Sequence, residues 1–420
     1  MNFLQGNCLV AQSGGPTAVI NSSAYGVIKE FMENRKDEKI FVGLNGIEGI
    51  LNNKIYDVDK LSMAELNIMK YLPSSSLGSC RYKLKNPEDS IEEYEKIFNL
   101  FETNNIKYFF YIGGNDSMDA AKKLCDYAKD IKSDIKIIGV PKTIDNDLVE
   151  TDHCPGFGST AKYVCNTGIE LWLDTRTYYT NSIMVMEVMG RDAGWIAASS
   201  GLIKEAIPDI NQLIYLPEVP FRAEKFLQDV KSAVAENGKL LVVTSEGLKN
   251  SEGDYINVDS NCYENDQFGH KQLGGIGKYL QTLIKDNVEK RVKLAELGVS
   301  QRCAMHCVSK TDLDEAELVG RVAVKYAIQG KTGFMVALDQ VKDKENYECI
   351  TRLVELNLVC NAVKGVPKDF INSDGCSISK KMIDYVSPLI IGEINSFGNN
   401  GLLKHVDIRK SLGHIEGRHQ

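Results

Sequence analysis

Two aspartates stand two residues apart in segment 141–147, which reads Pro-Lys-Thr-Ile-Asp-Asn-Asp. The segment follows the apolar run 135–140, whose length and composition are typical of a fully buried strand. Asp145 and Asp147, with a threonine and a lysine beside them, could bind a metal ion and a phosphate together. The carboxyl end of a buried parallel strand opens onto a crevice, which favours a reactive loop. A solvated turn with an Asx cap is the alternative.

The elements that would position this loop follow from a repeated pattern. Runs rich in Ile, Val, Phe and Tyr occur at 8–11, 40–44, 106–112, 135–140, 183–188, 240–244 and 334–338. Most are followed by small or polar residues and then by helical spacing, as in the apolar positions between Ile20 and Phe31. Strand, polar turn, helix and strand in succession predict an α/β fold with a largely parallel sheet.

The polar turns after these strands are the other candidate site segments. They are residues 13–15, 113–117, 141–147, 189–192 and 245–247. Loops after parallel strands gather at one edge of a sheet, so we expect these turns to share a cleft. Their glycine pairs would let backbone N–H groups approach an anion, although each pair alone could be an ordinary tight turn. Neither the dinucleotide fingerprint nor the Walker phosphate loop is present, so any phosphate binds by another arrangement.

Composition limits the class of protein. With 420 residues the chain is long enough for two domains, and 43% hydrophobic and 25% charged residues are typical of a soluble globular protein. No apolar run approaches the roughly 18 residues that span a bilayer, and the N-terminus lacks signal-peptide features, so we expect a cytoplasmic protein. The net charge of −8 argues against nucleic acid as a partner but leaves room for a basic pocket that binds a small anion.

Cysteine and histidine usage points to structural roles. The 11 cysteines are spread along the chain and do not form a disulfide framework. Cys303 and Cys307 flank His306, but their spacing is not that of a zinc finger, so we interpret them as ordinary thiols. His153 follows the 141–147 loop, and we interpret it as structural and not as a proton shuttle.

Taken together and in order, these motifs resemble the phosphofructokinase family. The matching segments are 13–15, 77–81, 113–117, 141–147 and 187–191, extended by Glu246 and Arg302. The resemblance covers about residues 8 to 340. It implies Mg²⁺-dependent, reversible phosphoryl transfer to the 1-hydroxyl of fructose 6-phosphate, giving fructose 1,6-bisphosphate, a step of glycolysis and gluconeogenesis.

The resemblance also implies an architecture. We expect two Rossmann-like α/β domains with mainly parallel sheets and an active site in the cleft between them. Residues 1–158 plus 301–345 would form the phosphoryl-donor domain, and residues 159–300 plus 346–420 would form the fructose 6-phosphate domain.

Catalytic roles are carried over by position. Asp145 would be the general base that accepts the hydroxyl proton. Thr143 would hydrogen-bond the moving phosphoryl group, and Arg191 would neutralise the charge that it carries in flight. Asp116 and Asp147 would hold Mg²⁺.

Binding roles follow in the same way. The positions that match donor-binding ones are Gly14, Gly15, Arg81, Gly114, Asp116 and Lys142. Those that match acceptor-binding ones are Thr143, Asp145, Met189, Gly190, Arg191, Glu246, Lys293 and Arg302. Lys293 stands where the family has an arginine that reaches into the neighbouring subunit's site, which implies a homodimer or homotetramer.

Two positions bear on the phosphoryl donor. Asp116 and Lys142 replace glycines of the ATP-using members, and their side chains would fill the space of a nucleotide's α-phosphate. This resembles the pyrophosphate-dependent branch, so we expect pyrophosphate as donor. An ATP-dependent enzyme and a catalytically idle sugar-phosphate-binding protein are the alternatives. Three departures from the family pattern, Asn115, Ser182 and Val299, affect the metal and acceptor sites.

Overall fold

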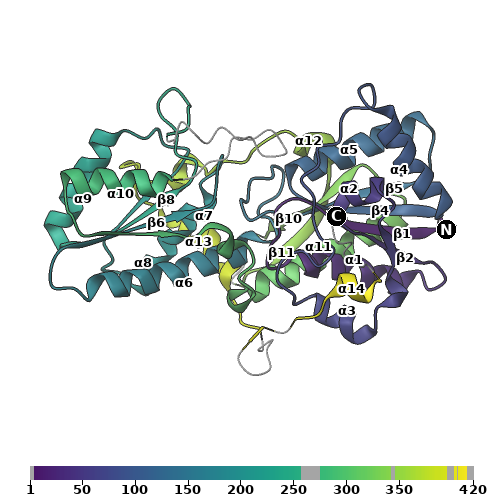
Figure 1. Ribbon diagram of the computed structural model, residues 1–420, viewed down its shortest axis with the longest axis horizontal. Coiled ribbons are helices and arrows are strands. Elements are labelled where there is room, and N and C mark those ends of the chain that lie inside the picture. Colours follow the sequence, from purple (N-terminus) through teal and green to yellow (C-terminus); the bar gives the residue numbers. More distant parts are fainter. Residues whose placement is uncertain (1–3, 257–274, 342–345, 395–401, 404, 414–420) are drawn as a thin grey trace, which may run out of the picture.

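The computed structural model describes residues 4–256, 275–341, 346–394, 402–403 and 405–413. Figure 1 shows two lobes side by side along the long axis, each built round its own sheet. One sheet has seven strands in the order β11-β10-β5-β4-β1-β2-β3, and the other has four in the order β7-β8-β6-β9. The predicted α/β fold with mainly parallel sheets is confirmed.

The seven-stranded sheet contains the predicted strands of the first lobe. Its members are β1 (Asn7–Gln12), β2 (Ile40–Gly43), β3 (Ile55–Asp57), β4 (Ile106–Gly113), β5 (Lys136–Pro141), β10 (Phe334–Gln340) and β11 (Cys349–Glu355). The five central strands pair in parallel, whereas the edge strands β3 and β11 are antiparallel to their neighbours. The apolar runs therefore became strands that are buried on both faces, as parallel sheets require.

Helices cover both faces of this sheet. One face packs against α1 (Ile20–Asn34), α3 (Met63–Met69), α11 (Lys310–Ile328) and the short α14 (Ile408–Ser411). The other packs against α2 (Gly46–Leu51), α4 (Ile91–Thr103), α5 (Asn115–Asp130) and α12 (Leu356–Val359). α1 and α11 cross very closely, because a Cβ at Gly26 would lie 2.2 Å from the Glu317 carbonyl oxygen and one at Gly320 would lie 2.2 Å from that of Ser23.

The second lobe repeats this arrangement on a smaller scale. Its parallel strands are β6 (Ser182–Val188), β7 (Gln212–Tyr215), β8 (Lys239–Ser245) and β9 (Val292–Glu296). One face carries α6 (Phe157–Arg176), α7 (Trp195–Ser199), α8 (Ile203–Ala206) and α13 (Lys380–Val386). The other carries α9 (Ala223–Asn237) and α10 (Ile276–Asn287).

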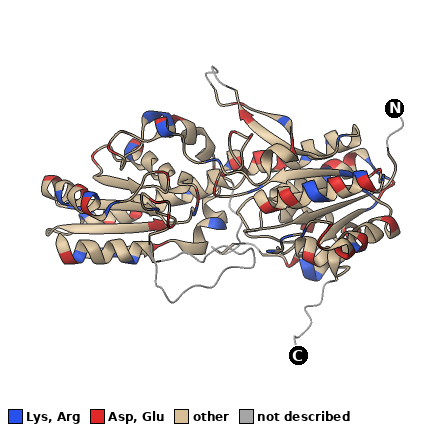
Figure 2. Cartoon of the chain, turned by 90° about the horizontal axis from the view of Figure 1, so that it is seen from above, with Lys and Arg blue, Asp and Glu red and all other residues tan. Residues whose placement is uncertain are grey.

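Short 3₁₀ turns complete the described structure. They are Val58–Lys60, Ser200–Leu202, Gly298–Arg302, Met305–Cys307, Lys368–Phe370 and Ser387–Ile390. None of the described helices is both long and apolar enough to cross a membrane. Figure 2 shows Lys and Arg interspersed with Asp and Glu on the helices of both lobes.

The prediction that residues 346–420 accompany the second lobe is wrong for β11 and for the short helix α14. β11 pairs with β10 as the edge of the seven-stranded sheet, from Phe334↔Glu355 to Gln340↔Cys349. α14 also lies on the first lobe, where Ser411 Oγ donates to Glu65 Oε1 at 2.6 Å. Among the described residues of this range, Tyr347 and the stretch from Val366 to Ile390, which includes α13, pack in the second lobe. The other domain limits stay predictions.

Candidate active site

A cavity of about 430 Å³ lies where loops of both lobes meet. Its lining follows β1, β4 and β5 of the first sheet and β6 and β8 of the second. In the first sheet β1 and β4 are neighbours, although the chain continues from them in opposite directions, to β2 and to β5. The loops after β1 and β4 therefore diverge and leave a crevice at the carboxyl ends of the strands.

Most of the predicted site residues meet in this cavity. Those that line it are Gly14, Gly15, Arg81, Gly114, Asp116, Lys142, Thr143, Asp145, Asp147, Met189, Arg191, Glu246 and Arg302. Gly190 and Lys293 do not line it. Segments separated by nearly 290 positions thus form one surface, as the gathering of loops at the sheet edges led us to expect.

The 141–147 loop is fixed by backbone bonds at its start. The Lys142 N–H donates to the Gly113 carbonyl at 3.0 Å, and the Thr143 N–H donates to the Pro155 carbonyl at 3.2 Å. The first bond ties the loop to the end of β4, and the second ties it to the segment that leads into α6. The loop therefore bridges the two lobes.

Asn146 reverses the chain between the two aspartates. Its φ of 55° lies in the left-handed region, which asparagine tolerates better than most residues. Its Nδ2 donates to Tyr385 OH at 2.8 Å, and its Oδ1 accepts from the Cys154 N–H at 3.0 Å. With the side chain of Asn146 held away from the cavity, Asp145 and Asp147 on either side both line it.

Burial makes these carboxylates unusually basic. It raises the pKa of Asp145 to about 7, and the nearby carboxylates of Asp147 and Glu246 add to the rise. The cations of Arg191 and Lys142 oppose this rise without cancelling it. Burial likewise raises the pKa of Asp147 and of Glu246. A carboxylate whose pKa lies close to neutrality is suited to accept a proton during a reaction.

Buried cations face the same cavity. Lys142 is 2% exposed and its Nζ donates to the Gly15 carbonyl at 2.7 Å. Burial lowers the pKa of Lys142 to about 8, although Asp145 acts in the opposite direction. Within the described residues, Arg191 Nη1 and Arg302 Nε are buried without a hydrogen-bond partner. Buried donors of this kind are expected to meet a ligand.

Gly14 allows the lysine to lie where it does. Its φ of 75° is in the region that favours glycine, and a Cβ there would lie 3.2 Å from Lys142 Nζ. The glycine pair that follows β1 therefore serves close packing against a cation as well as a tight turn.

Gly190 lies just behind the cavity wall. Its φ of 123° favours glycine, and Ser245 Oγ donates to its carbonyl. The Gly190 N–H points to Glu246 Oε1 at a long 3.4 Å, and the neighbouring Met189 N–H donates to Gln301 Oε1 at 3.3 Å. Gly190 therefore contacts Glu246, whereas Gln301 holds the backbone of Met189, and both Glu246 and Met189 line the cavity.

Lys293 lies elsewhere, near the amino end of its strand. On β9 it pairs with Met184 of β6, so it is remote from the carboxyl ends where the cavity opens. Its Nζ lies 2.6 Å from Asp174 Oδ2 and 3.2 Å from Tyr178 OH. Ser182, at the buried start of β6, is in the same region. The expected role of Lys293 in a neighbouring subunit's site stays a prediction.

Sequence reasoning missed one wall of the cavity, residues 361–363. Asn115 Nδ2 donates to the Ala362 carbonyl at 2.9 Å, and the Lys364 N–H donates to the Asp147 carbonyl at 2.8 Å. An aspartate in place of Asn115 could not donate this bond, which gives a structural reason for that departure. The segment carries no motif, so no signal in the sequence marked it.

Four further lining residues were also not singled out: Pro16, Thr17, Lys83 and Ala193. Pro16, Thr17 and Ala193 extend polar turns that were identified from the sequence. Lys83 lies two residues after segment 77–81.

The chain is similar over nearly its whole length to known proteins. The phosphofructokinase family model matches residues 7–325. The pyrophosphate–fructose 6-phosphate 1-phosphotransferase of Xanthomonas campestris is 39% identical over 407 residues, covering 96% of each chain. The protein of that name from Halomonas elongata is 38% identical over 411 residues, covering 97% of each. The crystal structure of pyrophosphate-dependent phosphofructokinase from Nitrosospira multiformis aligns with a TM-score of 0.86 at 35% identity, covering 96% of each chain.

Proposed function

This chain belongs to the phosphofructokinase family, and on that premise we propose that it transfers a phosphoryl group from pyrophosphate to the 1-hydroxyl of fructose 6-phosphate. The products are fructose 1,6-bisphosphate and phosphate. The observation that carries the proposal is the half-buried Asp145, whose pKa lies near 7 in a cavity that it shares with Lys142 and Arg191.

Asp145 acts as the general base. As the hydroxyl oxygen bonds to phosphorus, its proton passes to the Asp145 carboxylate, and the bond from phosphorus to the leaving phosphate breaks. A base placed in this way contributes roughly 10²–10⁴ in rate. Thr143 donates a hydrogen bond to the transferred group and Arg191 neutralises the negative charge that it carries. Such transfer depends mainly on positioning and electrostatic stabilisation.

The donor end of the cavity favours a short, highly charged molecule. Lys142 places a cation beside the glycine loop that follows β1. Asp116, at the first turn of α5, occupies volume and adds negative charge beside Gly114. A pyrophosphate fits next to these side chains, whereas a nucleotide would have to pass them. Gly14, Gly15, Gly114 and Arg81 complete the proposed donor site.

Two carboxylates of the cavity could hold a divalent metal, and we propose that the metal is Mg²⁺. Asp116 and Asp147 offer the carboxylate oxygens that a hard cation prefers. Ionising the half-buried Asp147 costs free energy, as its raised pKa indicates, and a nearby cation would offset that cost. When bound, Mg²⁺ would neutralise part of the phosphate charge and orient the donor.

The acceptor end is formed by the second lobe. Glu246 would accept a hydrogen bond from a sugar hydroxyl, and Arg302 would bind the 6-phosphate as a fork. Met189 and Gly190 would shape the wall beside the sugar. Lys293 would reach a partner subunit's site in a homodimer or homotetramer. Assembly and a cytoplasmic location stay predictions from the sequence.

The test is to follow phosphorus directly. Purified protein is incubated with pyrophosphate, fructose 6-phosphate and Mg²⁺, and ³¹P NMR records the products. We expect pyrophosphate to disappear as one phosphate and one new sugar 1-phosphate appear for each molecule consumed. An idle sugar-phosphate-binding protein would leave the spectrum unchanged. A reaction that proceeds with ATP but not with pyrophosphate would favour the ATP-dependent alternative.

A further inference from the structure

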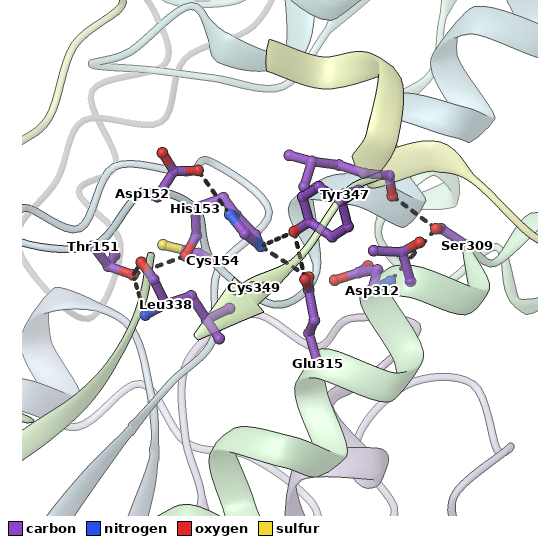
Figure 3. Close-up of polar contacts among 12 residues, drawn as sticks. Thr151, Asp152, His153, Cys154, Ser309, Asp312, Glu315, Leu338, Tyr347 and Cys349 are labelled. Atoms are coloured by element: carbon purple, nitrogen blue, oxygen red, sulfur yellow. Dashed lines mark hydrogen bonds and ion pairs between the residues drawn. The ribbon is translucent and has the colours of Figure 1, made fainter. Parts of the chain in front are cut away.

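A second group of ionisable side chains surrounds His153, six residues beyond the 141–147 loop (Figure 3). His153 is 2% exposed, and its ring lies between two carboxylates. Nδ1 is 2.9 Å from Asp152 Oδ1, and Nε2 is 2.8 Å from Glu315 Oε2. Tyr347 OH donates to the other oxygen of Glu315, Oε1. We call His153, Asp152, Glu315 and Tyr347 the histidine cluster.

The geometry fixes the charge of the ring. When Asp152 and Glu315 are both ionised they only accept hydrogen bonds, so each ring nitrogen donates and the ring is an imidazolium. Burial lowers the pKa of His153, but Glu315 and Asp152 outweigh it and bring the pKa to about 9. Cys349 and Tyr347, from β11 and the residues before it, also face the cluster, and burial raises the pKa of both.

The histidine cluster is tied to the reactive loop by two side chains of the C-terminal stretch. The Asp152 carbonyl accepts from Tyr385 OH and from Lys364 Nζ, each at 2.7 Å. Tyr385 OH in turn accepts from Asn146 Nδ2 at 2.8 Å. Asn146 stands between the two aspartates of the loop, so the position of Asp152 helps to set the position of Asp145.

The other end of the cluster is anchored on α11. One turn before Glu315, Asp312 accepts from the Gly156 N–H at 2.8 Å and from the Ser159 N–H at 2.9 Å. α11 of the first lobe therefore holds the segment from His153 to the start of α6 at two points. A shift of His153 would release one of them.

A metal ion is the competing explanation of this cluster. One ligand atom each from His153, Glu315 and Cys349 lies within 4.8 Å of the others. However, Glu315 already has both oxygens hydrogen-bonded, and His153 must keep its proton to satisfy Asp152 and Glu315 together. A metal at Nε2 would require loss of that proton and of the bond to Glu315.

We propose that His153 is a positioning residue, which as an imidazolium between Asp152 and Glu315 holds the loop that carries Asp145 in its reactive geometry. The inference rests on the proposed function, because it assigns the histidine cluster a part in the same reaction. A displacement of about 1 Å at a reacting group can cost up to 10²-fold in rate, so small movements of the loop matter.

The test compares Glu315→Gln with the unmodified protein. The glutamine keeps the shape but removes the charge that raises the histidine's pKa most, so we expect that pKa to fall by about one unit or more. With both substrates saturating, kcat of the unmodified protein should decline as the pH rises through about 9. In the variant this alkaline decline should begin at correspondingly lower pH, while KM for fructose 6-phosphate stays within about threefold. A purely structural role would not move the decline.

A second measurement reads the ring itself. NMR of ¹⁵N-labelled histidine, assigned by the signal lost in His153→Asn, should show an imidazolium above pH 8 in the unmodified protein. A ring that titrates near its ordinary pKa of about 6.5 overturns the proposal, as does an unchanged kcat profile in Glu315→Gln. This NMR result does not depend on turnover, so it separates failure of the inference from failure of the proposed function.

The matched control is Cys349→Ser. It removes the thiol of the candidate metal site, and the serine hydroxyl can still make the hydrogen bonds that Cys349 makes to Tyr347 and Glu315. We expect kcat and the pH profile to stay within about twofold of the unmodified values. One equivalent of zinc in the purified protein, together with loss of activity in Cys349→Ser, would replace the imidazolium with a metal site and overturn the proposal.

Discussion

Residues 142–153 carry one group of ionisable side chains at each end, and the two groups differ in what their side chains face. At one end Asp145, Asp147 and Lys142 face the cavity. At the other end His153 lies against Asp152 and Glu315 within hydrogen-bonding distance. Asp145 and Asp147 are half-buried, whereas His153 and Glu315 are buried, so the more exposed end is the one that is open to a ligand.

The pKa shifts at the two ends favour opposite charge states. Among the groups that face the cavity, burial has the largest effect and favours the neutral forms. The pKa of Asp145 therefore rises to about 7 and that of Lys142 falls to about 8. Around His153 the paired carboxylates dominate and favour the charged form. Charges that lack full compensation are available to a ligand and a proton, whereas charges that are fully paired hold the backbone in place.

Asp145→Asn removes the base from the cavity and should have the largest effect. We expect kcat to fall at least about 100-fold, with binding of fructose 6-phosphate little changed, because an amide cannot accept the proton. Steady-state rates and calorimetric binding measure the two quantities. Asp369→Asn, on an exposed ion pair with Lys381, is the control. Near-normal turnover in Asp145→Asn would remove the base assignment.

The double variant Asp116→Gly with Lys142→Gly tests the donor end of the cavity. We expect kcat/KM for pyrophosphate to fall at least about tenfold, since a buried cation is lost, and some ATP-dependent turnover to appear as space opens. Initial rates with each donor give the ratio. If pyrophosphate use survives and ATP is still rejected, then the crowding explanation fails.

Arg302→Lys tests the acceptor end of the cavity with a substitution that keeps the positive charge. Lysine keeps the charge but cannot present the bidentate fork, so KM for fructose 6-phosphate should rise about tenfold while kcat stays within about threefold. Arg352→Lys changes an arginine paired with Asp339 outside the cavity and should alter neither. Equal effects in both variants would contradict the role of Arg302.

The smallest expected effect is the pH dependence of donor binding. The pKa of Lys142 lies at about 8, so its charge is present below that pH and is lost as pH rises through it. KM for pyrophosphate should therefore rise about threefold between pH 7 and 9. In Lys142→Arg the charge persists across this range and the dependence should flatten. The same rise in both proteins would assign it to another group.

The sequence predicts the group that faces the cavity, around Asp145, far better than it predicts the histidine cluster. Segment 141–147 directly follows a buried strand and contains the reactive side chains itself, so its residue types alone indicate a site. His153 has no such local signal, because its partner Glu315 is 162 residues away and only the fold brings them together.

The C-terminal stretch was missed for a related reason. β11 is an edge strand whose residues are mostly half-buried or exposed, so no long apolar run marks it. Residues 361–363 form part of the cavity through backbone contacts, which are independent of side-chain type. Motif order indicated the cavity, but not the wall that this stretch contributes.

The central claim is that the cavity accepts a two-phosphate donor. The most direct test compares kcat/KM of the unmodified protein for pyrophosphate with kcat/KM for ATP. Both are measured with saturating fructose 6-phosphate and Mg²⁺. We predict a preference for pyrophosphate of at least about tenfold, one decade or roughly 1.4 kcal/mol in transition-state free energy. Equal or faster turnover with ATP would contradict the account.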